Sequence, residues 1–481
     1  MRSFVRGPLC AMMVVPVGAA LLLLVTIALL VRAEPLPGIV GGRSSEAPAS
    51  PLATGALSTT FPADGWVYGF TDAWAPDGST DAEGYLELVR SGSILPVQLT
   101  NDEGDAGPPA LAEHPRETIV AVWAGPSQTN EYGEWNNIEY ATFDAGGTPI
   151  LPITQLSNDE PRSYWGQYFV EDPVAAVAPT SGNVLFAWSQ FIHLGPGASW
   201  TEIYYAVRGP DGTEIKGPGL ITSTIAYAEE VSDPAAAAFA NGSFLVAWCH
   251  APVGGVDDAL EDIYYSILDA TGDVLAGPTN LTGNPAGQYD GDVRATGLAS
   301  GHVLLTWTGR HGLVQQIYYA VLDGTGGVIQ APTRLSDAPY GASSPDAAGL
   351  FNGSIIVAWQ AQGAQAGESQ IAYAMIDRTY APALPLPVGT TYLTNPLEPE
   401  NESVCIARDR SGQAVLTWRD GDEQQLYAAV VGNDGQVRTY PQILRTARGE
   451  RLYTDWTGAG CGSLPVPLSP SQYLPLVARN K

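Results

Sequence analysis

Lysine, histidine and cysteine are scarce in this sequence, and each shortage argues against a class of function. The only lysines are Lys216 and Lys481, and 50 acidic residues face 22 basic ones, which gives a net charge of −28. A surface this acidic repels phosphate backbones and anionic lipid headgroups, so we expect no nucleic-acid partner and no docking on a membrane surface. The five histidines show no metal-ligand spacing, and no CxxC pair suggests zinc.

The motifs of several enzyme classes are missing as well. The sequence contains no GxSxG, HExxH, P-loop or Rossmann fingerprint. Paired carboxylates such as Asp257 and Asp258 occur by chance in a chain with 50 acids, and sequence neighbours rarely face each other at the separation that glycoside chemistry needs. The sequence therefore assigns no catalytic residue and favours a binding protein over an enzyme.

The N-terminus is typical of an export signal. Arg2 and Arg6 precede an apolar stretch from Leu9 to Val31, and Ala33 ends a small-x-small cleavage site. We predict a signal peptide over residues 1–33 and a linker over 34–56. An uncleaved N-terminal anchor is the alternative, because the apolar stretch is long enough to span a bilayer. A cleaved signal leaves a mature chain without a membrane span, placed outside the cell or on its surface.

The cysteine count allows one disulfide bond in the exported chain. Cys249, Cys405 and Cys461 remain after cleavage, and three cysteines cannot build a disulfide framework. We expect Cys405 to pair with Cys461, because this bond would tie the C-terminal segment to the last repeat.

The strongest positive signal is a repeat in which a β-rich run ends in tryptophan. Six such runs stand 52 to 65 residues apart and end at Trp123, Trp188, Trp248, Trp307, Trp359 and Trp418. A second run such as IYYAVLD, a Gly-rich turn and a third run follow each of them, and an Ala-rich fourth run precedes it. Four short antiparallel strands in each repeat predict an all-β fold, a β-propeller of four-stranded blades.

The ends of the chain are expected to close the propeller. A partial repeat with Trp66 and Tyr85 lacks its first strand, which the segment after Ala447, including Leu452–Thr454, would supply. We predict seven blades over residues 57–460, with six or eight as alternatives, and a Pro-rich tail over 461–481. The recurring Trp and the second Tyr of each repeat are interpreted as packing residues, and we expect a monomer.

These repeats, over residues 57–456, resemble exported bacterial β-propeller repeat proteins of unassigned function. The tail SPSQYLPLVARNK is similar to the YLPLV-type ending of exported proteins from Chloroflexi-like bacteria. The architecture also resembles that of sialidases, but the Asp-box pattern S-x-D-x-G-x-x-W is missing from the repeats. Arg162, Arg310 and Arg419 fall in loops, so an arginine triad of the sialidase kind stays open.

An acidic residue stands at the entrance to the innermost strand of successive blades. These residues are Asp172, Asp233, Asp292, Asp346 and Glu402. Propeller geometry would place them around the mouth of the central channel, where a ring of carboxylates is costly unless it is hydrated or neutralised. A bound cation such as Ca²⁺ is the cofactor that this ring suggests. The alternative is that each acid only bonds nearby backbone N–H groups.

Aromatic residues cluster in the loops of the early blades. We take Trp135, Trp165, Tyr168 and Trp200, together with Arg310 and Arg419, as candidate ligand-binding residues, because indole rings stack on the C–H faces of sugars. Packing of loop on loop is the alternative. The favoured function is a binding or interaction module for a glycan or a protein at the cell surface. A carbohydrate-active hydrolase or lyase and a structural surface component are the alternatives.

Overall fold

The computed structural model divides into two compact units, Met1–Ser58 and Thr59–Lys481, and the fold lies in the second. Every regular element within the described residues is a β-strand, and none of these residues forms a helix long and apolar enough to cross a membrane. The structure describes residues 66–72, 83–90, 93–99, 107, 109–114, 118–130, 133–144, 146–158, 167–193, 199–222, 230–251, 261–285, 287–364, 368–381, 390–394, 401–409, 411–420, 426–443 and 460–463.

Six antiparallel sheets have four strands each. The first contains β1 (Trp66–Asp72), β2 (Glu83–Arg90), β3 (Ser93–Gln98) and β30 (Gly460–Ser463), and the second β4 (Ala110–His114), β5 (Thr118–Ala124), β8 (Ile138–Asp144) and β9 (Pro149–Gln155). The third contains β14 (Glu230–Ala238), β15 (Phe244–Ala251), β16 (Asp262–Leu268) and β17 (Val274–Asn280), and the fourth β18 (Tyr289–Gly297), β19 (Val303–Arg310), β20 (Gln316–Leu322) and β21 (Val328–Arg334). The last two contain β22 (Ala342–Gly349), β23 (Ile355–Gln362), β24 (Ser369–Ile376) and β25 (Thr391–Tyr392), and β26 (Asn401–Arg408), β27 (Ala414–Asp420), β28 (Leu426–Val431) and β29 (Val437–Ile443).

The remaining sheet has six strands. Its order is β13 (Glu214–Leu220), β12 (Ser199–Arg208), β11 (Val184–His193), β10 (Gln167–Val177), β7 (Gly133–Trp135) and β6 (Gln128–Asn130). The all-β propeller prediction is therefore confirmed, with six four-stranded blades, the number given as an alternative. The first choice of seven blades is corrected to six four-stranded blades, beside which this sheet adds the β6–β7 hairpin to four strands of its own.

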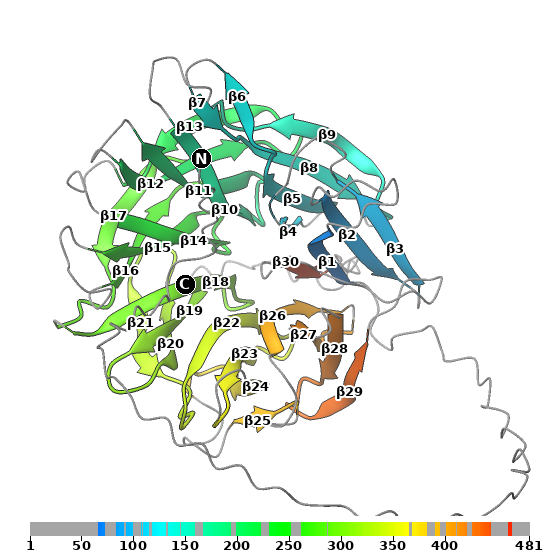
Figure 1. Cartoon of the computed structure of the whole chain (residues 1–481), viewed down its shortest axis with the longest axis vertical. Coiled ribbons are helices and arrows are strands. Elements are labelled where there is room, and N and C mark those ends of the chain that lie inside the picture. Colours follow the sequence, from blue (N-terminus) through cyan, green and yellow to red (C-terminus); the bar gives the residue numbers. More distant parts are fainter. Residues whose placement is uncertain are drawn as a thin grey trace, which may run out of the picture. The chain divides into compact units, whose positions relative to one another are not determined.

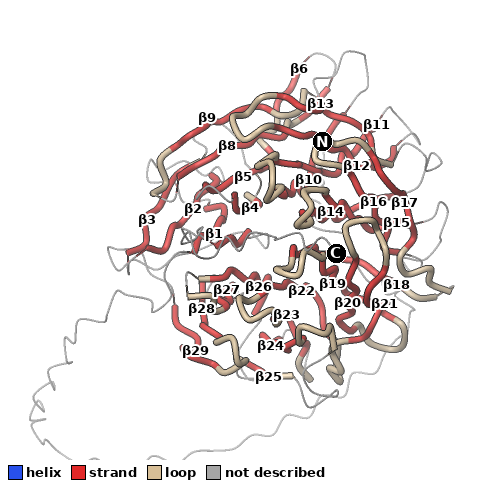
Figure 2. Tube along the Cα trace, turned by 180° about the vertical axis from the view of Figure 1, so that it is seen from behind, coloured by secondary structure: helices blue, strands red, loops and turns tan. Residues whose placement is uncertain are grey.

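The sheets stand side by side around a ring (Figure 1). Their innermost strands contact one another in the cyclic order β4, β10, β14, β18, β22, β26 and β30. The ring closes where β30, from the C-terminal segment, pairs with β1 through Trp66↔Ser463 and Gly69↔Gly460. The closing strand is thus Gly460–Ser463, whereas Leu452–Thr454, the segment named from the sequence, lies outside the described residues. Figure 2 shows the same ring from behind.

The recurring tryptophans fill the space between neighbouring blades. The six repeat tryptophans are each at most 1% exposed. One buried cluster joins Leu304 and Tyr319 of one blade to Ile355 and Trp359 of the next, and similar clusters connect the other neighbours. Truncation of a buried Trp costs about 3–5 kcal/mol, so these residues contribute strongly to the packing of neighbouring blades.

The second Tyr of the repeat adds a hydrogen bond to the packing expected for it. Four such hydroxyls donate to a backbone carbonyl in the β-turn of the following blade, with O···O distances of 2.8–2.9 Å: Tyr205 to Gly272, Tyr265 to Gly326, Tyr319 to Tyr380 and Tyr373 to Gly435. Each bond satisfies a hydroxyl that burial would otherwise leave costly, and it fixes the spacing of adjacent blades.

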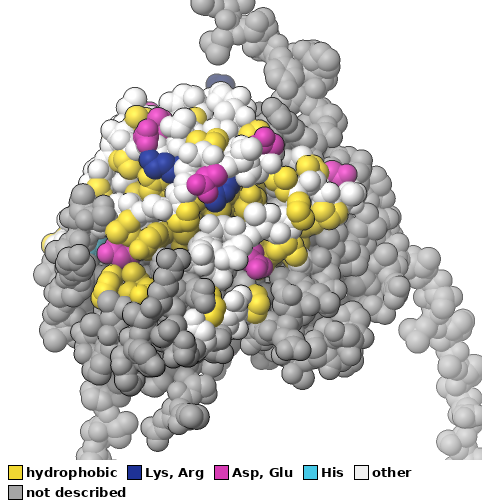
Figure 3. Space-filling view, turned by 90° about the horizontal axis from the view of Figure 1, so that it is seen from above, with side chains coloured by type: hydrophobic (Ala, Val, Ile, Leu, Met, Phe, Trp, Pro, Cys, Tyr) yellow, Lys and Arg dark blue, Asp and Glu magenta, His cyan; other side chains and the backbone are white. Residues whose placement is uncertain are grey.

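The outermost strands carry features that protect sheet edges. Pro218, Pro278, Pro332 and Pro441 occupy the fifth residue of β13, β17, β21 and β29, where a missing N–H prevents continued pairing. Exposed apolar residues also lie on outermost strands, such as Ile150 on β9, Leu275 on β17 and Ile329 on β21. Figure 3 shows one part of this rim, with hydrophobic side chains among separate acidic and basic ones.

Of the described cysteines, one forms a disulfide bond and one does not. Cys405 is disulfide-bonded, whereas Cys249 is a buried thiol outside any disulfide. Strand β30, which contains Cys461, contacts β26, which contains Cys405. The pairing of Cys405 with Cys461 therefore stays the expected one.

Candidate functional site

The two ends of the ring differ in the lengths of their connections. We call the end with the β19–β20 and β21–β22 connections the loop face, and the end with the short β18–β19 and β20–β21 turns the hairpin face. A short turn leaves little room for a ligand, whereas longer connections on a rigid scaffold are where binding residues concentrate. The candidate site residues named from the sequence belong to the loop-face half of the blades.

One blade projects further at the loop face than the others. Its strands β10, β11 and β12 contain 11, 10 and 10 residues, whereas β18, β19 and β20 contain nine, eight and seven. The β6–β7 hairpin pairs with the added length of β10. We call β6, β7 and the loop-face ends of β10, β11 and β12 the aromatic extension.

A row of large side chains crosses one face of the aromatic extension. Trp135 pairs with Tyr168, Tyr168 with Ile192, and Ile192 with Trp200. Directly paired residues point to the same side of a sheet, so these four side chains form a continuous row. Trp135 and Ile192 are buried at 7% and 8% exposure, while Tyr168 and Trp200 are half-buried. The structure therefore brings together Trp135, Tyr168 and Trp200, and Trp165 lies outside the described residues.

The opposite face of the aromatic extension is aromatic too. Phe169 pairs with Phe191, and the Phe191 ring stacks on His193 at 6.3 Å between ring centres. All three side chains are half-buried. The aromatic extension therefore carries aromatic side chains on both of its faces.

The predicted ring of acids has a local backbone cause. In five inner strands the pairing with the next strand shifts by one residue at a β-bulge. Asp172, Asp233, Asp292 and Ser344 occupy this bulge with φ between 49° and 58°, the left-handed region. Short polar residues tolerate that conformation best after glycine, which explains why Asp recurs there.

Two members of the predicted ring do not share that position. Ser344 takes the place of an acid in β22, so Asp346 is instead equivalent to Arg294 of β18. Glu402 lies just before the bulge of β26, and its side chain is outside the described part of the structure. The equivalence of five acids is therefore corrected to three.

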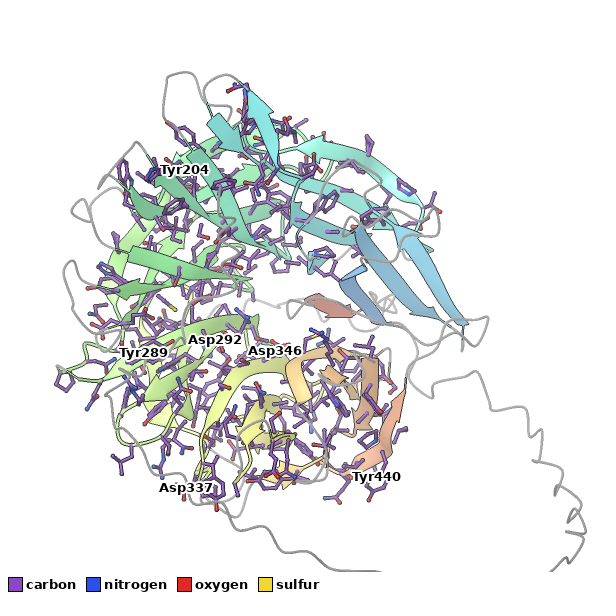
Figure 4. The ribbon with its side chains drawn as sticks, viewed as in Figure 1. Tyr204, Tyr289, Asp292, Asp337, Asp346 and Tyr440 are labelled. Atoms are coloured by element: carbon purple, nitrogen blue, oxygen red, sulfur yellow. The ribbon has the colours of Figure 1, made fainter. Side chains whose placement is uncertain are left out.

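The acids nevertheless share one electrostatic environment at the ring centre. We call Asp172, Asp233, Asp292, Asp346 and Arg294 the axial cluster. Burial and the neighbouring Asp233 raise the pKa of Asp172 to about 7, and burial raises the pKa of Asp346 to about 6. Burial also raises the pKa of Asp292, whose carboxylate lies 3.5 Å from the Arg294 guanidinium. Figure 4 labels Asp292 and Asp346 on the strands that face the centre.

Hydrogen bonds hold the axial cluster to its blades. Thr308 Oγ1 donates to Asp292 at 3.3 Å, and the backbone N–H of Ser344 donates to Thr308 Oγ1 at 3.1 Å. The backbone N–H of Ile406 donates to Asp346 at 2.6 Å and so links β26 to β22. No three His, Cys, Asp or Glu side chains among the described residues are arranged to hold a metal ion. Ca²⁺ at the axial cluster stays a prediction, and melting temperatures in EDTA and in Ca²⁺ would test it.

The two candidate arginines lie apart. Arg310 ends β19 and is half-buried, while Arg419 lies on β27 at 9% exposure. The sheet of β22–β25 separates these two blades along the chain and in the contact order of the inner strands. Arg310 and Arg419 thus come from blades that are not neighbours, and a joint role in ligand binding stays a prediction.

Sequence reasoning missed a polar network beside Arg310. Asp290 is completely buried and its carboxylate accepts hydrogen bonds from Trp307 and His311. The signal was present in the repeats, because Val170 and Val231 occupy the equivalent position of β10 and β14, two residues before the bulge. An acid at an aliphatic core position is informative even without a known motif.

The chain was also compared with known proteins. No protein-family model and no curated protein matches it. Among solved structures it is similar to a puromycin hydrolase, with 15% identity and a TM-score of 0.47 over 78% of this chain and 52% of that one. An ulvan lyase has 13% identity and a TM-score of 0.45 over 78% and 92% of the two chains. A sialidase from Streptococcus pneumoniae has 9% identity and a TM-score of 0.43 over 69% and 67%.

Proposed function

We propose that this propeller is a carbohydrate-binding module and that the aromatic extension holds the sugar. The observation that carries the proposal is the row of Trp135, Tyr168, Ile192 and Trp200 across a sheet that only one blade builds. The buried pair, Trp135 and Ile192, supports the row, and the half-buried pair, Tyr168 and Trp200, supplies rings at the surface.

Aromatic rings on a rigid sheet suit the physics of sugar binding. The C–H faces of a pyranose pack on the electron-rich face of Trp or Tyr, and ring stacking contributes about 0.5–1.5 kcal/mol beyond the buried area. Strand pairing fixes the backbone positions of these residues, so little conformational entropy is lost when a ligand binds. The aromatic extension therefore presents preorganised stacking groups.

The negative net charge of the chain makes acidic glycans unfavourable ligands. A net charge of −28 opposes the approach of polyanions such as sulfated or uronic-acid polymers, especially at low ionic strength. We therefore propose a neutral glycan as the ligand. The predicted export signal adds the proposal that the glycan is met outside the cell or at its surface.

A glycan array probed with the full-length chain tests this proposal. We expect binding to neutral glycans that falls at least about tenfold in the Trp200→Ala and Tyr168→Ala variants, the loss of about 1.4 kcal/mol. The matched control is Tyr440→Ala, since Tyr440 is 74% exposed on β29 of another blade. An array without any signal, or equal losses in the Tyr440 variant, would contradict the proposal and favour a protein partner.

A further inference from the structure

Asp290 is a buried carboxylate where neighbouring blades have aliphatic side chains. It stands two residues before the bulge residue Asp292, and the equivalent residues Val170, Val231 and Ala342 are all buried. Asp290 itself has 0% exposure. A buried charge costs several kcal/mol unless hydrogen bonds and partners offset the loss of water, so the shared blade packing gives no reason for it.

Three side chains donate hydrogen bonds to Asp290. Oδ1 accepts from Trp307 Nε1 at 2.9 Å and from His311 Nε2 at 2.8 Å, and Oδ2 accepts from Asn284 Nδ2 at 2.5 Å. Room for Oδ1 depends on Gly309, because a Cβ there would lie 2.5 Å from that oxygen. This carboxylate is thus surrounded by four residues, Asn284, Trp307, Gly309 and His311.

The tryptophan alone does not explain the acid. The equivalent indole N–H groups of Trp188, Trp248 and Trp359 are buried and have no hydrogen-bond partner among the described residues. The fold therefore tolerates a repeat Trp without an acceptor. The group that distinguishes this blade is His311, which follows β19 at the loop face.

His311 is held by a hydrogen bond of one ring nitrogen. Its Nε2 lies 2.8 Å from Asp290 Oδ1, and a neutral ring that donates to this carboxylate carries its lone pair on Nδ1. The side chain is 23% exposed, and its ring lies 4.4 Å from the ring of Tyr318. Buried carboxylate, oriented imidazole and partial exposure together make the arrangement of a general base.

Positive charge lies beside this imidazole. Arg310 is its neighbour in the chain, and Arg334 pairs in register with Tyr318, whose ring contacts His311. Arg334 also forms a 3.0 Å ion pair with Asp337 in which both side chains are nearly half exposed. A guanidinium at this place can stabilise negative charge that develops on an oxygen during a reaction.

We propose that His311 and Asp290 form a hydrolytic site for carboxylic esters on neutral sugars. The proposed nucleophile is a water molecule activated by His311, whose imidazole Asp290 orients. Nδ1 takes a proton from water, and the water oxygen bonds to the acyl carbon to give a tetrahedral oxyanion. Collapse breaks the bond to the sugar oxygen, which takes the proton from His311. Ester and water become carboxylic acid and alcohol.

Asp290 acts here as a positioning residue for His311. The proposal shares the ligand class of the proposed function but uses a different blade, so binding at the aromatic extension and hydrolysis at His311 can each fail alone. Glycan binding measured in parallel should be unchanged in a His311 variant and reduced in Trp200→Ala.

The test uses full-length protein and p-nitrophenyl acetate, with release of nitrophenolate followed from pH 5 to 9. We expect His311→Gln to lower the protein-dependent rate about 100-fold, the lower end of general-base effects. Asp290→Asn should lower kcat with little change in KM, because the imidazole loses the partner that orients it. His302→Gln, on the hairpin face, is the matched control.

Three results would overturn the proposal: an unchanged rate in His311→Gln, an equal loss in His302→Gln, or an unchanged kcat in Asp290→Asn. Asp290→Val is the second variant in case Asp290→Asn does not fold, because Val is the residue of β10 and β14 at this position. A folded Asp290→Val protein that keeps the full rate would equally exclude the positioning role.

Discussion

Neutralising Asp346 should change how the stability of the ring depends on pH. Burial raises the pKa of this carboxyl to about 6 in the folded protein, against an ordinary value of 3.8. A raised carboxyl pKa means that its contribution to stability is fully present below the unfolded value and is lost as the pH rises through the folded value. The folded protein should therefore lose stability between about pH 4 and pH 6, and the effect of this group should be constant above that range.

The magnitude follows from the shift. A difference of about 2 pKa units at about 1.4 kcal/mol each gives an upper bound of about 3 kcal/mol for Asp346 at pH 8. Asp172 has a larger shift, but the residue is in contact with solvent, which screens its charge, so we assign it no energy of its own. Turn carboxylates such as Asp323, whose pKa the hydrogen bond from Thr325 lowers, titrate below this window.

Urea midpoints at pH 4, 5, 6 and 8 and constant ionic strength measure the effect. Asp346→Asn keeps an acceptor for the Ile406 N–H, so it should be closest to wild type at pH 4 and more stable than wild type at pH 6 and pH 8. Asp337→Asn removes the same charge from an exposed ion pair and is the matched control. A constant difference between wild type and Asp346→Asn at all four pH values would refute the reasoning.

Further predictions concern the inter-blade bonds and the glycine beside Asp290. Tyr319→Phe removes the hydroxyl that donates to the Tyr380 carbonyl and should cost about 1 kcal/mol in urea unfolding, with Tyr440→Phe as the neutral control. Burial raises the pKa of Tyr319 to about 12, so the stability from this bond should be present below about pH 10 and disappear towards pH 12 in an alkaline titration. Gly309→Ala should cost about 1–3 kcal/mol, because its Cβ would meet Asp290, whereas Gly312→Ala has open space and should leave the urea midpoint unchanged.

The repeat allowed the architecture to be predicted, but not the count of regular blades. Trp123 through Trp418 mark the core of each blade in the sequence, since one buried residue type recurs at one structural position. The six-stranded sheet was not predictable, because the pairing of Trp135 with Tyr168 joins a loop of one repeat to a strand of the next. Such a parallel contact between neighbouring repeats leaves no periodic pattern.

The axial cluster was predictable in part, and the reason lies in the bulge. Asp233 and Asp292 stand fifteen residues before Trp248 and Trp307, and the same count before Trp359 gives Ser344. The sequence prediction includes Asp346 because it is acidic. The bulge position instead favours residues that tolerate a positive φ. Counting from the buried Trp finds the bulge, and charge alone does not.

A residue that differs from its equivalents in the other blades indicates function only when contacts between blades do not explain it. Tyr380 has φ 66° at a turn where Gly272 and Gly326 have φ near 90°, so it is as unusual among the blades as Asp290. Its hydroxyl, however, lies 2.6 Å from His302 Nδ1 and 2.8 Å from Ser300 Oγ, both on the adjacent blade. Contact between blades fully accounts for Tyr380. Asp290 is also linked to the preceding blade through Asn284, but its carboxylate differs from the Tyr380 hydroxyl because it also orients an imidazole at the loop face.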